Sequence, residues 1–209
     1  MHNKECRGVF QLVRPLILAS ASPRRQQLLA SLGLQFEVRP SRDKEPEWRQ
    51  GIEPAKYAVQ LAKNKGEDAA REFENAVILS ADTIVVLDDQ VLGKPSDKQD
   101  GLRMLLELKG KPHVVITGLF IQCRAIGLFK QETVATKVFM ADFPEEVLSS
   151  YMATGEGLDK AGSYAVQGIG SFLVERIEGS HTNVIGLPIT EVVNILLDAG
   201  LLKVCNQDG

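Results

Sequence analysis

The sequence has few cysteines and no long hydrophobic run. Its 209 residues include only three cysteines, Cys6, Cys123 and Cys205, which lie far apart and show no Cys-x-x-Cys or Cys/His spacing. This argues against a disulfide framework and against a zinc site. No apolar run approaches the roughly 20 residues of a membrane helix, and residues 1–14 lack the apolar core of a signal peptide. We therefore expect a cytoplasmic protein that does not associate with membranes and has a frayed extension over residues 1–14.

The sequence also lacks a large excess of charge and the common nucleophile motifs. The net charge is −3, with 24% charged residues, so no basic surface for polymeric nucleic acid is expected. There is no G-x-S-x-G motif, no cysteine lies beside a histidine, and His2, His113 and His181 are scattered. These absences disfavour serine or cysteine nucleophiles. A cysteine hydrolase using Cys123 remains a minor alternative.

Apolar runs and helical spacings alternate along the chain. The apolar runs predict strands at 16–19, 76–87, 113–123 and 132–140, and the 3.6-residue spacing predicts helices at 23–32, 53–71, 97–109, 144–154 and 188–199. Ser96 and Gln99 match a capping box for the third helix. Interleaved strands and helices, with two hairpin-like pairs, predict a mixed sheet covered by helices in one domain over residues 15–205.

The stretch "LASASPRRQQLLASLG" places two arginines in the first turn of a helix. Ser22 suits the N-cap, Pro23 suits the first helical position, and Arg24 and Arg25 follow directly. Cations at this end of a helix dipole are disfavoured by about 0.3–1 kcal/mol each. Either both arginines point into water, or they face a bound anion such as phosphate, which helix N-termini and guanidinium groups bind well.

Three charged residues fall at positions that a plain core does not explain. Asp82 lies inside an apolar strand, Lys65 lies on the apolar face of the second helix, and Lys94 stands between Gly93 and Pro95. Asp82 is either a structural carboxylate or part of a site, and Lys65 either extends its ammonium to water or faces a partner. Polyphosphate with a divalent metal would account for the whole set, which is Arg24, Arg25, Glu45, Lys65, Asp82, Lys94 and Asp159.

Residues 155–188, "GEGLDKAGSYAVQGIGSFLVERIEGSHTNVIGLP", hold a large share of the 18 glycines around one short strand-like run. Glycine allows backbone conformations that other residues avoid. This density predicts either tight turns or backbone shaped around a ligand.

Four blocks in this order, "LASASPRR", "SADTIVVLDDQVLGKP", "TGEGLDKAGSYAVQGIGSFLVERIEGS" and "TNVIGLP", resemble the Maf family of nucleoside triphosphate pyrophosphatases. The resemblance covers residues 15–200. It implies the fold of the inosine-triphosphate pyrophosphatases, an elongated mixed α/β sheet flanked by helices in two lobes with a central cleft. It also implies hydrolysis between the α- and β-phosphates of a nucleoside triphosphate with a divalent metal, Mg²⁺ or Mn²⁺.

The resemblance implies roles for particular residues. Asp82 matches the proton acceptor, and Glu45 matches a metal-binding glutamate that acts with Asp82. The polar and cationic positions around the phosphates are Ser20, Arg25, Lys65 and Lys94. The chain departs from the family pattern at "SRDKE", residues 41–45, where Arg42, Asp43 and Lys44 replace the usual Asp, Ile and Asp.

Base recognition divides the family into branches that act on dTTP and UTP or on N7-methyl-GTP. Thr83, Gln167 and Arg24 stand here as in the pyrimidine branch. The resemblance therefore implies a dTTP/UTP pyrophosphatase that cleans nucleotide pools. The alternatives are an N7-methyl-GTP pyrophosphatase and a nucleotide-binding regulator of cell division without turnover. A homodimer is also expected from the family.

Overall fold

A single mixed sheet forms the centre of the computed structural model, which describes residues 8–42, 46 and 48–205. Its path is β3-β2-β4-β6-β7-β8, with β5 beside β4. β2 is parallel to β3 and β4, and the other pairs are antiparallel. The strands are β2 (Leu16–Leu18), β3 (Glu37–Val38), β4 (Val77–Leu87), β5 (Gln90–Leu92), β6 (Pro112–Cys123), β7 (Leu128–Met140) and β8 (Val174–Glu178).

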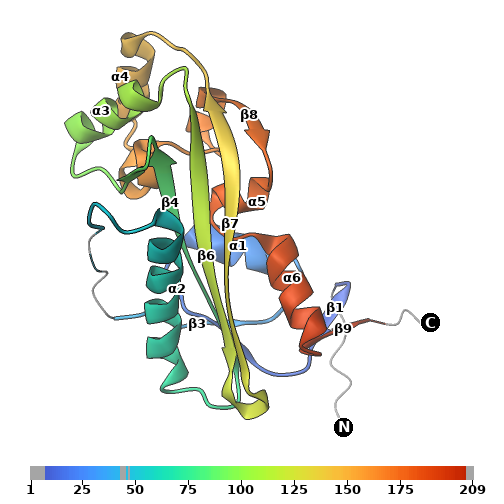
Figure 1. The fold of residues 1–209 in the computed structure, drawn as a ribbon. Helices are drawn as coiled ribbons and strands as arrows, with labels where there is room; N and C mark the ends of the chain where they lie inside the picture. Colours follow the sequence, from blue (N-terminus) through green and yellow to red (C-terminus); the bar gives the residue numbers. More distant parts are fainter. Residues whose placement is uncertain (1–7, 43–45, 47, 206–209) are drawn as a thin grey trace.

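Helices flank this sheet, which confirms the predicted mixed α/β architecture (Figure 1). In Figure 1, α3 and α4 lie at the upper end of the sheet, whereas α6 lies toward its lower end. The helices are α1 (Pro23–Ala30), α2 (Pro54–Ala70), α3 (Lys98–Leu108), α4 (Glu145–Ala153), α5 (His181–Ile185) and α6 (Ile189–Asp198). Short 3₁₀ turns are η1 (Arg124–Ile126), η2 (Glu156–Asp159), η3 (Ala161–Ser163) and η4 (Ile169–Leu173).

Helix α2 packs closely against β4 and β6. A Cβ on Gly118 of β6 would lie only 2.3 Å from the carbonyl carbon and oxygen of Ala58 in α2. Real Cβ atoms do not approach backbone so closely, so glycine at this position lets the helix backbone lie on the strand. Gly118 also pairs with Asp82 across the β4–β6 ladder, so this close packing occurs beside the candidate site.

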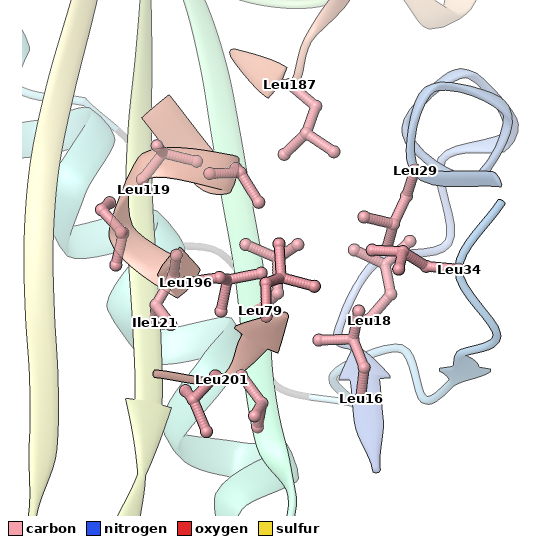
Figure 2. Packing of buried hydrophobic residues seen from close by; sticks show 14 of the residues in the cluster. Leu16, Leu18, Leu29, Leu34, Leu79, Leu119, Ile121, Leu187, Leu196 and Leu201 are labelled. Atoms are coloured by element: carbon pink, nitrogen blue, oxygen red, sulfur yellow. The ribbon is translucent and has the colours of Figure 1, made fainter. Parts of the chain in front are cut away.

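The hydrophobic core is divided into two large clusters along β4. Figure 2 shows part of the first cluster, where β2, β4, α1 and α6 meet; it includes Leu16, Leu18, Leu29, Leu79, Leu119, Leu187 and Leu196. The second lies around α3 and α4 and includes Val85, Leu105, Leu108, Leu148 and Leu173. Leu79 belongs to one cluster and Val85 to the other. The middle of β4 therefore lies between two separately packed lobes.

Residues 9–13, within the predicted amino-terminal extension, are more ordered than predicted. Phe10–Leu12 form β1, which pairs antiparallel with β9 (Leu202–Val204), and the Cys205 N–H donates to the Val9 carbonyl at 2.9 Å. The expectation of a frayed extension is therefore wrong for this segment, because its backbone groups find partners on a distant strand.

Cys205 is disulfide-bonded, which the cysteine spacing did not predict, whereas Cys123 is a buried free thiol.

The capping box of α3 lies one residue later than predicted. Asp97, not Ser96, is the N-cap, and its carboxylate accepts the N–H of Asp100 at 2.8 Å. The Asp100 carboxylate in turn accepts the N–H of Ser96 at 3.0 Å. An ionised carboxylate is a stronger acceptor than a hydroxyl, which favours this register.

Among the described residues, no helix is both long and apolar enough to span a membrane.

Candidate active site

A cleft of about 1000 Å³ opens between the two lobes. It is lined from the β2–α1 connection, α2, β4, the turn after β5 and the glycine-rich stretch. Eight predicted site residues line it together: Ser20, Arg24, Arg25, Lys65, Asp82, Thr83, Lys94 and Gln167. The ninth, Glu45, lies outside the described residues. Segments far apart in the sequence thus converge on one cavity.

Asp82 and Lys65 form a largely buried ion pair that lines the cleft. Lys65 on α2 donates its Nζ to Oδ1 of Asp82 on β4, and the two side chains are 17% and 10% exposed. Each charge offsets the desolvation cost of the other. Of the two interpretations of Lys65, the structure therefore supports a partnered ammonium. The carboxylate of Asp82 remains among the groups that line the cavity.

Arg25 lies in the cleft and holds three segments together. Its Nε donates to the Gly186 carbonyl at 2.7 Å, and Nη2 donates to Thr83 Oγ1 at 3.0 Å. Nη1 donates to Ser20 Oγ at 3.3 Å. These oxygen acceptors account for a cation in the first turn of α1, where the helix dipole disfavours it. For Arg25, the interpretation that it simply points into water is wrong.

A chain of buried polar groups fixes the segment that Arg25 contacts. Thr83 Oγ1 lies 2.9 Å from Thr117 Oγ1, and Thr117 donates to the Asn183 carbonyl at 3.3 Å. The fully buried Asn183 donates Nδ2 to Thr136 Oγ1 at 3.0 Å and to the Val115 carbonyl at 3.2 Å. Sequence reasoning missed Thr117 on β6 and Asn183 on α5, because the residue spacing within one element does not show which side chains of other elements it contacts.

Arg24 faces the opposite rim of the cleft. Its Nη1 lies 3.2 Å from Asp159 Oδ2 on η2, with side-chain exposures of 29% and 64%. Asp159 also accepts from Lys160 Nζ at 2.6 Å. Burial raises the pKa of Asp159, but Lys160 and then Arg24 lower it more, so the pKa lies below the ordinary value. The Arg24–Asp159 pair joins α1 of one lobe to the glycine-rich stretch.

Gln167 and Lys94 lie on exposed turns at the cleft. Gly93, beside Lys94, accepts the N–H of Gly162 at 3.0 Å, which ties the turn to the glycine-rich stretch.

Behind Gln167, the carboxylate of Glu156 accepts the N–H groups of Ile169 at 2.8 Å and Gly170 at 2.7 Å. Glu156 also lines the cleft, and sequence reasoning missed it. The glycine density was the available signal, since it indicated a shaped backbone there.

The cleft thus has two sides, which we name by their residues. The strand side consists of Ser20, Arg25, Lys65, Asp82 and Thr83. The loop side consists of Arg24, Glu156, Asp159 and Gln167. Cations on both sides could bind an anionic ligand, and Asp82 supplies a carboxylate that could accept a proton or hold a cation.

The family model described as Maf-like protein matches residues 15–199. The chain belongs to the Maf family. A relative named dTTP/UTP pyrophosphatase in Nitratidesulfovibrio vulgaris is 44% identical to this Maf chain over 195 residues, which are 93% of this chain and 92% of the relative. A relative with the same name in Geobacter metallireducens is 48% identical over 187 residues, which are 90% of this chain and 97% of the relative. The resemblance drawn from the four sequence blocks is therefore confirmed.

A solved structure titled as a HAM1 protein from Coxiella burnetii is also similar to this Maf chain. The sequence identity is 15% and the TM-score is 0.42, with coverage of 63% of this chain and 75% of that one.

Proposed function

We propose that this chain is a nucleoside triphosphate pyrophosphatase that hydrolyses dTTP and UTP to the monophosphate and pyrophosphate. The relatives that carry this name are 40–48% identical to the chain over most of its length. The observation that carries the chemistry is the Lys65–Asp82 pair, which lines a cleft large enough for a nucleotide and rimmed by further cations.

The strand side, together with Lys94 from the turn after β5, supplies the groups that this hydrolysis needs. Asp82 would orient a water molecule for attack on the α-phosphorus and accept its proton. Lys65, Arg25 and Lys94 would neutralise the charge that develops on the phosphate oxygens, with Ser20 as a further hydrogen-bonding group. Phosphoryl transfer depends mainly on such positioning and charge stabilisation. Because Lys65 already contacts Asp82, the carboxylate is held in place before substrate binds.

A divalent metal, Mg²⁺ or Mn²⁺, belongs to this proposal. No group of three or more His, Cys, Asp or Glu that could hold a metal occurs within the described part of the chain. Mg²⁺ commonly binds one or two protein carboxylates together with substrate phosphates and water, and the carboxylate of Asp82 fits that arrangement. Asp82 and Glu45 would hold the cation, which when bound supplies positive charge to the phosphate oxygens.

The metal assignment predicts that chelation of divalent cations abolishes turnover. Glu45→Gln should weaken the dependence on Mg²⁺, so that half-maximal activity requires more of it, because one charged ligand is lost. Titration of activity with Mg²⁺ measures this. An unchanged titration curve would remove Glu45 from the metal site and leave Asp82 in place.

Base recognition is assigned to the loop side. Uracil and thymine present a carbonyl, an N–H and a second carbonyl along one edge, and the amide of Gln167 can both donate and accept there. Arg24 can donate to a carbonyl, and Thr83 of the neighbouring strand side is the third residue of this set. We further propose that the protein acts in the cytoplasm and forms a homodimer. Its ligands would be nucleoside triphosphates rather than nucleic acid.

Incubation of the purified protein with Mg²⁺ and each of dTTP, UTP, CTP and N7-methyl-GTP tests the proposal, with pyrophosphate release as the readout. We expect release from dTTP and UTP. Preference for N7-methyl-GTP would overturn the pyrimidine assignment. Tight triphosphate binding without pyrophosphate would instead support a cell-division regulator that acts without turnover.

A further inference from the structure

Glu156 is the acidic residue on the loop side that holds backbone rather than a cation. Its two carboxylate oxygens accept one N–H each, from Ile169 at 2.8 Å and from Gly170 at 2.7 Å. These are the first two residues of η4, which begins two positions after Gln167. N–H groups at the start of a helical turn have no partner within it, so a carboxylate there satisfies two donors at once.

The backbone beside Gln167 is shaped to admit this carboxylate. Gly168 has φ +79° and ψ −150°, a conformation open essentially to glycine alone. A Cβ at Gly168 would lie 2.3 Å from Glu156 Oε1, so the carboxylate also packs directly on its Cα. The path of the chain through Gln167 and Gly168 and the position of Glu156 therefore depend on each other.

Glu156 is itself held in place at its backbone. Its N–H donates to Thr154 Oγ1 at 3.2 Å, and its carbonyl accepts from Lys160 Nζ. Burial raises the pKa of the Glu156 carboxyl, but the N–H groups of Gly170 and Ile169 lower it more, so the pKa lies below its ordinary value. The group is thus a fixed, ionised acceptor at neutral pH. With both oxygens engaged by N–H groups, it is suited to orienting the loop.

We propose that Glu156 is the positioning residue for base recognition, because it fixes the loop that presents Gln167 to the pyrimidine. This rests on the proposed function for the identity of the base. Glu156 does not touch the reacting atoms, so it acts through Gln167. Its loss should weaken binding of the base much more than it slows the chemical step at Asp82.

Glu156→Gln is the informative substitution, because an amide offers one acceptor oxygen and turns an NH₂ group toward the other backbone donor. We expect KM for dTTP to rise about tenfold, with kcat within about threefold of the unsubstituted protein, the pattern for loss of binding shared by ground and transition states. Glu156→Asp keeps the charge and should restore part of the affinity. Glu175→Gln is the matched control, since Glu175 is exposed on β8 and does not line the cleft.

A double-mutant cycle with Gln167→Ala separates positioning from a general structural role. If Glu156 acts through Gln167, then Glu156→Gln adds little to KM once Gln167 is alanine. Additive effects, or an unchanged KM in Glu156→Gln, would overturn the inference. If Glu156→Gln does not fold, as judged by its thermal unfolding, Glu156→Asp takes its place in the cycle.

The inference is judged separately from the proposed function by measuring dTTP binding calorimetrically. If the unsubstituted protein binds dTTP but releases no pyrophosphate, the proposed function fails, and Kd replaces KM in the same cycle. If turnover is normal and the cycle is additive, the role of Glu156 fails while the function stands. No binding of dTTP at all would overturn both.

Discussion

The strand side and the loop side of the cleft are built on different principles. On the strand side, Asp82 is on a long central strand, Lys65 comes from a helix packed against it, and Arg25 makes three hydrogen bonds to other segments. On the loop side, Gln167 and Asp159 are exposed. The turn that carries Gln167 includes Gly168 with positive φ and is bound by the Glu156 carboxylate, whereas Asp159 contacts Arg24 and Lys160. The strand side is thus held by a sheet and a core, and the loop side by a few polar contacts.

This difference matches the two tasks proposed for the cleft. Positioning a water against phosphorus tolerates little displacement, which favours side chains on strands and packed helices. Recognition of a base can be altered by changing turns while the chemistry remains intact, since loops tolerate variation. Substitutions on the strand side should therefore change kcat, and substitutions on the loop side should change KM and substrate preference.

The largest effect is expected for Asp82→Asn. The amide preserves the shape of the side chain but removes the charge that accepts a proton or binds a cation, so kcat should fall by about 10²-fold or more. Pyrophosphate release measures this, with circular dichroism to verify folding. Asp89→Asn, in the exposed turn after β4 where φ is +62°, is the control and should keep normal activity. Near-normal turnover in Asp82→Asn would remove the main distinction between the two sides.

A buried pair beneath the loop side should make stability depend on pH. His113 Nε2 lies 2.7 Å from the hydroxyl of Tyr164, which lines the cleft, and burial lowers the pKa of His113 from 6.5 to about 4. At pH values between these two pKa values, His113 is protonated in the unfolded chain but neutral in the native protein, so the unfolded chain binds more protons. The free energy of unfolding should therefore be unaffected above pH 6.5 and fall by about 3 kcal/mol as the pH decreases toward 4.

Urea denaturation across this pH range measures the effect. His113→Asn should flatten the pH dependence, whereas His181→Asn, at an exposed position, should leave it unchanged. An equally steep dependence in His113→Asn would assign the loss to other groups. It would also mean that protonation of the buried His113 does not destabilise the protein.

The sequence predicted the strand side better than the loop side, for physical reasons. Asp82 and Lys65 were recognisable because a charge within an apolar pattern must find a partner. The strand at 76–87 and the helix at 53–71 agree with β4 and α2 to within about two residues, since long periodic segments determine their own secondary structure. That the two charges meet each other is a consequence of packing, which the periodicity does not contain.

On the loop side, the sequence indicated only a shaped backbone. Glu156 looks like an ordinary acidic residue after a turn, because its N–H partners follow it by 13 and 14 residues through turns without a periodic pattern. The same limit applies to β1, whose partner β9 lies at the other end of the chain. The shift of the α3 cap from Ser96 to Asp97 shows that boundaries are uncertain where two capping residues are adjacent.

A smaller effect is expected when Gln167 is changed on the loop side. Gln167→Glu removes the amide donor and adds a charge, so the ratio of kcat/KM for dTTP to that for N7-methyl-GTP should fall roughly tenfold, the size of one lost buried polar contact. For the unsubstituted protein, CTP should be a poor substrate, because the cytosine amino group stands where uracil has a carbonyl and would face the Arg24 donor. Comparison of kcat/KM for the four nucleotides measures this. An unchanged ratio would show that the exposed amide does not read the base.

The smallest effect is expected for Asp159→Asn, which tests whether the rim contact competes with substrate. Arg24 and Asp159 form an exposed pair at 3.2 Å, and such pairs contribute about 0–1 kcal/mol. If Arg24 must leave Asp159 to donate to the base, removing the carboxylate should lower KM for dTTP by about two- to fivefold without changing kcat. Asp142→Asn is a matched control, because Asp142 pairs with Lys109 at the same 3.2 Å and is 75% exposed. A higher KM in Asp159→Asn would instead mean that the pair holds Arg24 ready for the base, and the loop side would then be more preorganised than its exposed turns indicate.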